Sequence, residues 1–205
     1  MLKQLRPAIV SVLAFTILTG FLFPALITLV AKVAFSHQAN GSLITKNGKV
    51  VGSALVGQTF VKAIYFHPRP SAAGSGYDAS SSGGSNLGPT SDKLLNGIPD
   101  DPKTKADESF AGIKQLALAY RAENGLPANA PLPADAVTRS ASGLDPQISP
   151  QNAALQAPRV AKARGLSVDK VQQLIAQNTQ GRGLGVLGEA GVNVLQLNLA
   201  LDGAK

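Results

Sequence analysis

The sequence predicts an α+β protein in which one membrane-spanning helix is followed by a single mixed domain. Three features support this prediction: an uncharged run over residues 7–31, an Asn-Gly dipeptide inside the extended stretch 42–54, and helical spacing of apolar residues after residue 100. We therefore expect an anchor in residues 1–34 and one domain, with a β-hairpin near the membrane and several helices, in residues 35–205.

The uncharged run is long enough to cross a bilayer. As a helix, residues 7–31 would extend roughly 37 Å, more than the roughly 30 Å hydrocarbon core of a membrane. A cleaved signal peptide is the alternative, but its apolar region would be shorter and would end in a small-x-small site, which the residues around Ala31 and Ala34 do not supply. A single uncleaved span is the favoured interpretation.

Three residues of the span are candidates for packing against other membrane helices. Thr16 and Gly20 lie four residues apart on one helical face, where small side chains let a partner helix approach closely. Ordinary lipid-facing residues are the alternative interpretation of this pair. Pro24 predicts a kink, which membranes tolerate when neighbouring groups satisfy the freed backbone.

The charges that flank the span predict its orientation. Lys3, Arg6 and the terminal amino group precede the span, whereas only Lys32 follows it closely. The positive-inside rule therefore places the short N-terminus in the cytoplasm and residues 35–205 outside the membrane. The chain has no cysteine, so this outer domain has no disulfide bonds and depends on its apolar core.

The charge balance excludes nucleic acid as an expected partner. The net charge is +7, but residues 35–205 carry only 16 Lys and Arg against 12 Asp and Glu. A surplus this small, with three Tyr and seven Phe in the whole chain for base stacking, is not typical of nucleic-acid binding.

The first part of the outer domain is predicted to be a hairpin and then a long loop. Asn47 and Gly48 tolerate the positive φ angles of a tight hairpin turn between the extended runs of residues 42–54. Residues 71–91 contain twelve Gly or Ser and one charged residue, Asp78. Such a loop is either a flexible linker or an ordered contact surface.

The remainder of the outer domain is predicted to be mainly helical. The spacing of apolar residues predicts helices over residues 101–124, 150–164 and 168–178. Pro158 should kink the second helix or divide it into two short ones. Residues 192–201 alternate as a strand does but also suit a buried helix, which we favour.

Two of these helices have recognisable start signals. Ser149 precedes a proline at the first helical position, and Ser167 precedes the helix at residue 168, so both are predicted N-caps. Leu166 is placed to pack on Val171, which is the spacing of a hydrophobic staple.

No catalytic residue and no metal site is predicted. Residues 183–188 match G-x-G-x-x-G, but a dinucleotide site needs a strand before the glycines, and the segment before them looks helical. A flexible or turn-forming segment is the favoured interpretation. His37 and His67 are far apart in the sequence and lack clustered carboxylates, so neither a metal site nor a catalytic triad is expected.

Eight short segments, in order along the chain, are more specific than any of these motifs. They are residues 5–8, 39–44, 52–58, 65–72, 82–88, 140–145, 159–164 and 192–202. On these segments the chain resembles the KdpC family, the C subunit of the bacterial Kdp high-affinity potassium-transporting P-type ATPase, nearly from end to end.

The resemblance implies a non-catalytic accessory subunit of an ATP-driven potassium uptake pump in the bacterial inner membrane. Its partners would be a channel-like potassium-binding subunit and a P-type ATPase subunit. As the family is described, it stabilises assembly and acts as a catalytic chaperone that increases the ATP affinity of the ATPase subunit. No cofactor is expected on the chain alone, and ATP is implied only for the complex. A free-standing, membrane-anchored extracytoplasmic ligand-binding module is the alternative.

The family pattern nominates the glycine-rich loop for contact with a ligand or a partner, and we favour a partner. Backbone groups that glycine leaves accessible can pair across an interface, and a large side chain can anchor it. The candidate contact residues are Tyr77, Gly83, Gly84, Ser85, Asn86 and Leu87. Because the outer domain cannot reach cytoplasmic ATP, any effect on nucleotide affinity would pass through the partners.

Overall fold

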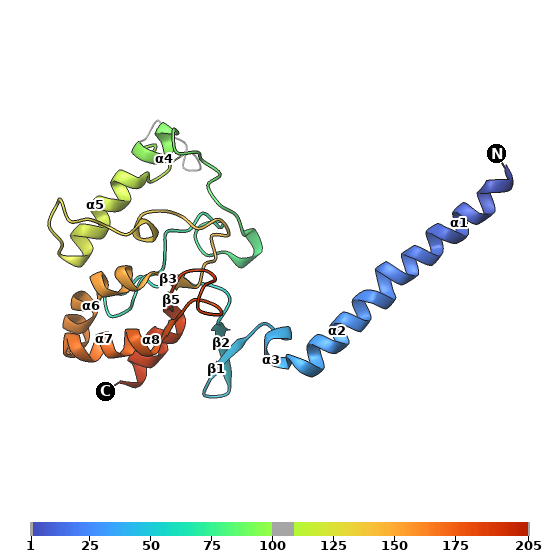
Figure 1. Ribbon diagram of the computed structural model, residues 1–205. Coiled ribbons are helices and arrows are strands. Elements are labelled where there is room, and N and C mark those ends of the chain that lie inside the picture. Colours follow the sequence, from blue (N-terminus) through green and yellow to red (C-terminus); the bar gives the residue numbers. More distant parts are fainter. Residues whose placement is uncertain (1, 100–108, 205) are drawn as a thin grey trace. The chain divides into compact units, whose positions relative to one another are not determined.

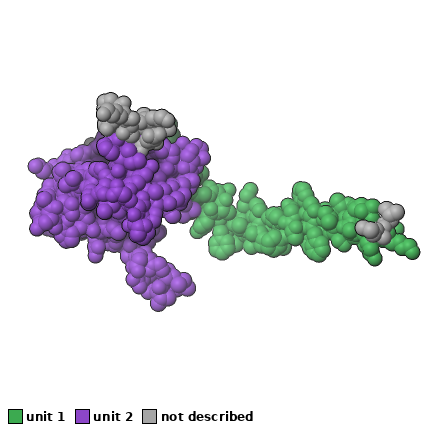
Figure 2. Space-filling view, turned by 90° about the horizontal axis from the view of Figure 1, so that it is seen from above, with its two compact units in different colours: residues 1–53 green, residues 54–205 purple. Residues whose placement is uncertain are grey.

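A computed structural model describes residues 2–99 and 109–204, and the chain separates into two compact units (Figures 1 and 2). Unit 1 is Met1–Ser53 and unit 2 is Ala54–Lys205. This division by compactness falls after the hairpin, because the hairpin strands contact each other within unit 1. The division into an anchor of residues 1–34 and an outer domain of residues 35–205 concerns the membrane surface and stays a prediction.

The predicted span is one long helix of three consecutive parts. These are α1 (Leu2–Ile17), a π-helical turn (Leu18–Leu22) and α2 (Phe23–Ala34), and their apolar stretch is long enough to cross a membrane. The π-helical turn ends two residues before Pro24, whose ring would collide with the carbonyl group of Gly20, one turn earlier, in a regular α-helix. In Figure 1 the helix continues as one rod through this region. The proline therefore changes the local hydrogen-bonding pattern of the helix but does not break the helix.

The predicted hairpin is confirmed. Strand β1 (Leu43–Lys46) pairs antiparallel with β2 (Lys49–Ser53), and a one-turn helix, α3 (Ser36–Ala39), precedes them. Asn47 and Gly48 have φ angles of 52° and 75°. Positive φ at both turn positions matches the twist of the strands, and Asn and Gly tolerate it, which explains why this dipeptide predicted the hairpin.

Unit 2 consists of short helices around a small sheet, so the α+β prediction is confirmed (Figure 1). The sheet has the order β3-β5-β4, and both of its strand pairs are antiparallel. In chain order the elements are η2 (Ala79–Ser81), α4 (Asp92–Asn96), α5 (Ile113–Asn124), η3 (Ala134–Ala136), β3 (Gln147–Ile148), α6 (Pro150–Arg164), α7 (Val168–Gln177), β4 (Thr179–Gln180), β5 (Gly191–Asn193) and α8 (Val194–Gly203).

The helix predicted over residues 101–124 is shorter at its start than the spacing suggested. Residues 101–108 lie outside the described part of the chain, and α5 begins only at Ile113. Phe110 instead forms an antiparallel bridge with Ile98, and its ring lies 4.0 Å below the guanidinium group of Arg139. The helical spacing of apolar residues includes Phe110, but its backbone pairing with Ile98 decides its conformation.

The helix containing Pro158 is continuous, so the prediction of two short helices is wrong. α6 extends without interruption from Pro150 to Arg164. Pro158 and Ala154, whose carbonyl group loses its helical donor, are both on the exposed face. Water can satisfy that carbonyl group, and the predicted N-cap, Ser149, accepts a hydrogen bond from the Asn152 amide at 3.1 Å.

The ambiguous segment 192–201 contains both kinds of structure. It begins in β5 and continues as α8 from Val194. The side chain of Asn193 marks the change, because its oxygen accepts a hydrogen bond from the Gln196 amide at 3.0 Å and caps the helix.

The core lies between α6, α7, α8 and the sheet. It consists mainly of aliphatic side chains together with one phenylalanine. Its large buried members are Phe66, Ile148, Val160, Val171, Val192, Leu197 and Leu201, and Leu166 packs against this cluster as the predicted staple requires. Ser167 caps α7 by accepting from the Lys170 amide at 3.2 Å.

Candidate functional site

The glycine-rich loop is ordered and lies against the segment 140–145. The Ser71 hydroxyl donates to the Gly143 carbonyl at 2.7 Å, and the Gly83 amide donates to the Ser142 carbonyl at 2.9 Å. A side chain at Gly143 would collide with the loop, since an added Cβ would lie 2.7 Å from the Gly83 carbonyl oxygen. These contacts hold the loop against the domain between residues 71 and 84, which favours an ordered surface over a flexible linker, and its contact with a partner stays a prediction.

Tyr77 is fixed inside this arrangement. Its hydroxyl donates to the Arg69 carbonyl at 2.9 Å, and its amide donates to the Ser71 hydroxyl at 3.0 Å. Burial, followed by the charge of Asp145, raises the pKa of the Tyr77 hydroxyl, which therefore stays protonated as a donor. Gly57 makes room for the ring, because an added Cβ there would lie 2.5 Å from it.

The other candidate contact residues divide into two groups. An added Cβ at Gly84 would lie 2.9 Å from the Ala141 carbonyl oxygen, whereas one at Gly83 would meet nothing within 4 Å. Asn86 is exposed with a φ angle of 50°, and Ser85 and Leu87 are half-buried. Tyr77 and Gly84 thus have internal contacts, and Asn86 presents its side chain to solvent. Contact between any of these candidate residues and a partner stays a prediction.

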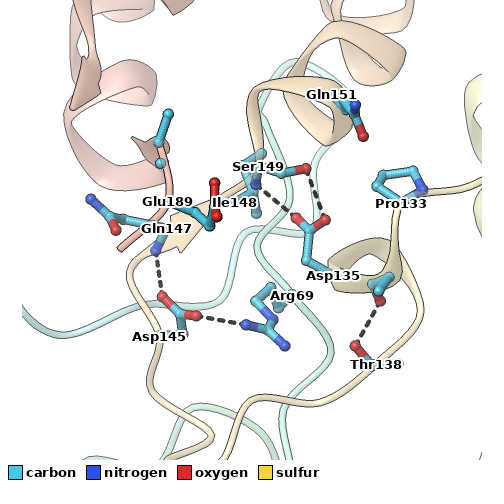
Figure 3. Close-up of a pocket in the computed structure, with 13 residues that line it drawn as sticks. Arg69, Pro133, Asp135, Thr138, Asp145, Gln147, Ile148, Ser149, Gln151 and Glu189 are labelled. Atoms are coloured by element: carbon cyan, nitrogen blue, oxygen red, sulfur yellow. Dashed lines mark hydrogen bonds and ion pairs between the residues drawn. The ribbon is translucent and has the colours of Figure 1, made fainter. Parts of the chain in front are cut away.

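A cleft of about 460 Å³ is lined by residues of η3, β3, the start of α6 and the segment 189–191, together with Arg69 and Asp145 (Figure 3). On its floor Arg69 pairs with the Asp145 carboxylate at 2.9 Å, and the Gln147 amide donates to the same carboxylate at 3.0 Å. Among the described residues, the buried Nε of Arg69 has no hydrogen-bond partner. This Nε is shielded from solvent, so the cleft exposes only the remainder of the Arg69 side chain, which is 23% exposed and already paired with Asp145.

Asp135, also in this cleft, has a structural role. Its carboxylate accepts from the amide and the hydroxyl of Ser149, both at 2.8 Å, and from the Asn152 side chain at 2.9 Å. It thereby fixes the start of α6. In the described ranges no group of three His, Asp or Glu side chains is arranged to hold a metal ion.

Buried amide side chains hold the extended segment before the loop, and the sequence reasoning missed them. Asn198 is 1% exposed, and it accepts from the Phe66 amide at 2.8 Å and donates to the Phe66 carbonyl at 3.0 Å. Gln156 pairs in the same way with His67, at 2.8 and 3.0 Å. Each amide side chain thus pairs with the backbone amide and carbonyl groups of one residue, as the backbone of a neighbouring strand would. One signal of this role was available in the sequence: Asn198 is a polar residue on the otherwise apolar face of α8, and a buried polar side chain needs hydrogen-bond partners.

Two arginines of α6 extend this network. Arg159 donates to the carbonyl groups of Ala63 and Tyr65 at 2.7 and 3.1 Å, and Arg164 donates to that of Ile64 at 2.6 Å. Arg164 also pairs with Asp202 at 2.9 Å. Residues 63–67 are therefore held almost entirely by side chains of α6 and α8.

His67 contacts Glu123 at the edge of the same network. Its Nδ1 lies 2.7 Å from the Glu123 carboxylate, and its Nε2 lies 3.1 Å from the Lys62 carbonyl oxygen. The hydrogen bond from His67 is the main cause that lowers the pKa of Glu123. His67 thus joins the segment of residues 62–67 to α5 through its contact with Glu123.

The candidates for packing against other membrane helices are Thr16, Gly20 and Pro24. They lie on a helix whose apolar stretch has no buried residue. An added Cβ at Gly20 would meet nothing within 4 Å. Their packing against a partner helix stays a prediction.

Known proteins resemble this chain over nearly its whole length. The family KdpC, described as the c chain of a K⁺-transporting ATPase, matches residues 5–203. The potassium-transporting ATPase KdpC subunit of Mycobacterium tuberculosis strain H37Ra is 53% identical over 202 residues, which cover 98% of this chain and 99% of the relative. The KdpC subunit of Caulobacter sp. strain K31 is 53% identical over 203 residues, with 98% and 94% covered.

Proposed function

The chain belongs to the KdpC family of K⁺-transporting ATPase subunits, and on this premise we propose that it is the membrane-anchored docking subunit of a potassium uptake pump. It is a subunit of the ATPase complex and not an enzyme by itself. The main support for the docking role is that the family match includes both the apolar helix and unit 2.

The helix of residues 3–34 anchors the chain in the bacterial inner membrane, with the N-terminus in the cytoplasm and residues 35–205 outside. The chain has no cysteine, so Ser142→Cys would introduce a single thiol at an exposed position. A membrane-impermeant maleimide should label this variant in intact cells, whereas Lys3→Cys should be labelled only after lysis. The reverse pattern would overturn the orientation.

Unit 2 binds the outer face of its partners, the channel-like potassium-binding subunit and the ATPase subunit. Support comes from the loop of residues 71–91, which is fixed by hydrogen bonds to Ser142 and Gly143 and still exposes Asn86. An ordered loop loses little conformational entropy on binding, which favours its use as a contact surface.

The chain also acts as a catalytic chaperone that raises the ATP affinity of the ATPase subunit. Because unit 2 lies outside the cell in this proposal, the effect is a coupling free energy transmitted through the partner subunits and not a contact with ATP. The half-saturating ATP concentration of the pump should therefore be lower when the chain is present, and pump that lacks the chain should bind ATP more weakly.

A pull-down tests the docking role. Full-length chain in detergent should recover a potassium-stimulated ATPase, and a chain whose span is replaced by an unrelated membrane helix should recover less of it. Recovery of no ATPase by the full-length chain would overturn the proposal.

The cleft favours a second candidate function, a free-standing ligand-binding module. The partly exposed guanidinium group of Arg69 lines this cleft, and a guanidinium group is suited to bind a small anion. Calorimetric titration of the full-length chain with inorganic phosphate, acetate and ATP tests this. Binding that Arg69→Lys weakens would support the module, and no heat of binding would exclude it for these anions.

A further inference from the structure

A loop at one end of the small sheet exposes three aliphatic side chains. It leaves β4 after Gln180 and returns at the start of β5, where Figure 1 draws it beside the sheet. Leu184, Val186 and Leu187 are 91%, 73% and 62% exposed, and together we call them the apolar tip. Aliphatic side chains that cluster on a protruding loop are typical of a contact surface.

The loop that carries the apolar tip is closed by backbone hydrogen bonds and an exposed ion pair. Gly183 and Leu187 exchange two backbone hydrogen bonds, each 2.8 Å long. At the base of the loop Arg182 pairs with both carboxylate oxygens of Glu189, at 2.8 and 2.7 Å. The turn-forming interpretation of residues 183–188 is thus confirmed, and the tip is held in shape before it meets any partner.

The backbone at Leu184 gives no folding reason for a leucine. Its φ angle is 51°, in the left-handed region that favours glycine or asparagine. The side chain contributes nothing to the core, since it is almost fully exposed. A residue that is unfavourable for the turn and unused by the core indicates a role in contact with another molecule.

We propose that the apolar tip inserts into an apolar pocket on a neighbouring protein subunit of the pump. This inference rests on the proposed function. The chemistry of the loop favours a protein pocket over the bilayer surface, because interfacial lipid binding combines aromatic side chains with unpaired basic ones. Residues 181–189 contain no aromatic residue, and their one basic residue, Arg182, pairs with Glu189.

The size of the tip fits a supplementary contact within a larger assembly. A stable interface between free proteins buries roughly 800 Å² on each partner, more than three side chains can supply. The chain is already held beside its partners by its anchor, and tethering raises the effective concentration of a second contact. A small, preformed tip is sufficient under that condition.

Substitutions at Leu184 test the proposal. Leu184→Asn suits the left-handed backbone, so the melting temperature of the full-length chain should not fall, but recovery of the other pump subunits should drop by about tenfold, as loss of an interface anchor predicts. Leu184→Met keeps an apolar side chain and should recover the subunits normally. Leu118→Gln, at an exposed leucine on α5, is the matched control and should have no effect.

Cross-linking identifies what covers the tip. Leu184→p-benzoylphenylalanine in the assembled pump, irradiated in membranes, should give one adduct with another pump subunit. An adduct with lipid, an adduct with a second copy of this chain, or no protein adduct would overturn the proposal.

Failure of the proposed function can be distinguished from failure of the inference about the apolar tip. If the wild-type chain recovers no other subunit, the proposed function fails. If the wild-type chain and Leu184→Asn recover the subunits equally, only the inference about the tip fails.

Discussion

The span of unit 1 and residues 63–67 of unit 2 satisfy their backbone hydrogen bonds in opposite ways. In the span the amide and carbonyl groups pair within the helix, and the side chains are left exposed. Residues 63–67 form no regular element, and Asn198, Gln156 and Arg159 pair with their backbone. Side-chain substitutions should therefore damage the second region much more than the first.

The largest expected effect is at Asn198. Asn198→Leu keeps a similar volume but leaves the buried amide and carbonyl groups of Phe66 without partners, which should cost about 3 kcal/mol of unfolding free energy. Urea unfolding of the full-length chain in detergent measures the loss. Thr16→Leu in the span should leave the unfolding of unit 2 unchanged, and equal losses in the two variants would refute the comparison.

Two adjacent glycines of the loop provide a matched pair. Gly84→Ala should cost about 1–2 kcal/mol, because its Cβ would approach the Ala141 carbonyl oxygen, whereas Gly83→Ala should change stability little. The same unfolding assay compares them. A larger loss for Gly83→Ala than for Gly84→Ala would mean that the loop does not lie against residues 140–145 as described.

The expected effect of pH on Glu123 is smaller. Because its pKa is lowered in the folded state, the ionised carboxylate stabilises unit 2 above its ordinary pKa of 4.5, and this contribution is lost as the pH falls through the lowered value. The pair with His67 is partly exposed, so the contribution should be roughly 0.2–1 kcal/mol. Wild type should exceed Glu123→Gln in unfolding free energy at about pH 6, and the difference should shrink as the pH falls below the ordinary pKa of 4.5 and through the lowered one. A constant difference would contradict this assignment.

The smallest expected effect on the fold is at Gly20, where a side chain meets nothing within the chain. Gly20→Leu should leave the unfolding of unit 2 unchanged. If Thr16 and Gly20 form the predicted packing face, the same variant should lower recovery of the pump in the pull-down. Normal recovery would indicate that this face of the span is exposed to lipid.

The elements that the sequence predicted best are those whose signals are local. The Asn47-Gly48 turn, the Ser149 and Ser167 caps and the continuous apolar run of the span each depend on a few neighbouring residues. The prediction failed where distant residues decide the conformation. Phe110 pairs with Ile98 instead of extending α5, and α6 tolerates Pro158 because that face is exposed.

The candidate site shows the same division. The sequence nominated the loop of residues 71–91, but it could not show that Tyr77 and Gly84 face inward while Asn86 faces solvent, because residues 57 and 140–145 determine this. It also predicted a turn-forming segment at residues 183–188, without indicating the exposure of Leu184.

By itself the sequence determined the family, the long N-terminal apolar helix, the hairpin and most helix boundaries, since these depend on composition and on contacts between near neighbours. Only the tertiary structure decided which polar side chains are buried and which apolar ones are exposed. Asn198 lies in the core and Leu184 in solvent, against the ordinary preference of each residue. The environment of Asn198 depends on Phe66, 132 residues away in the sequence, and that of Leu184 on where the turn of residues 183–187 places it, so neither follows from the local sequence.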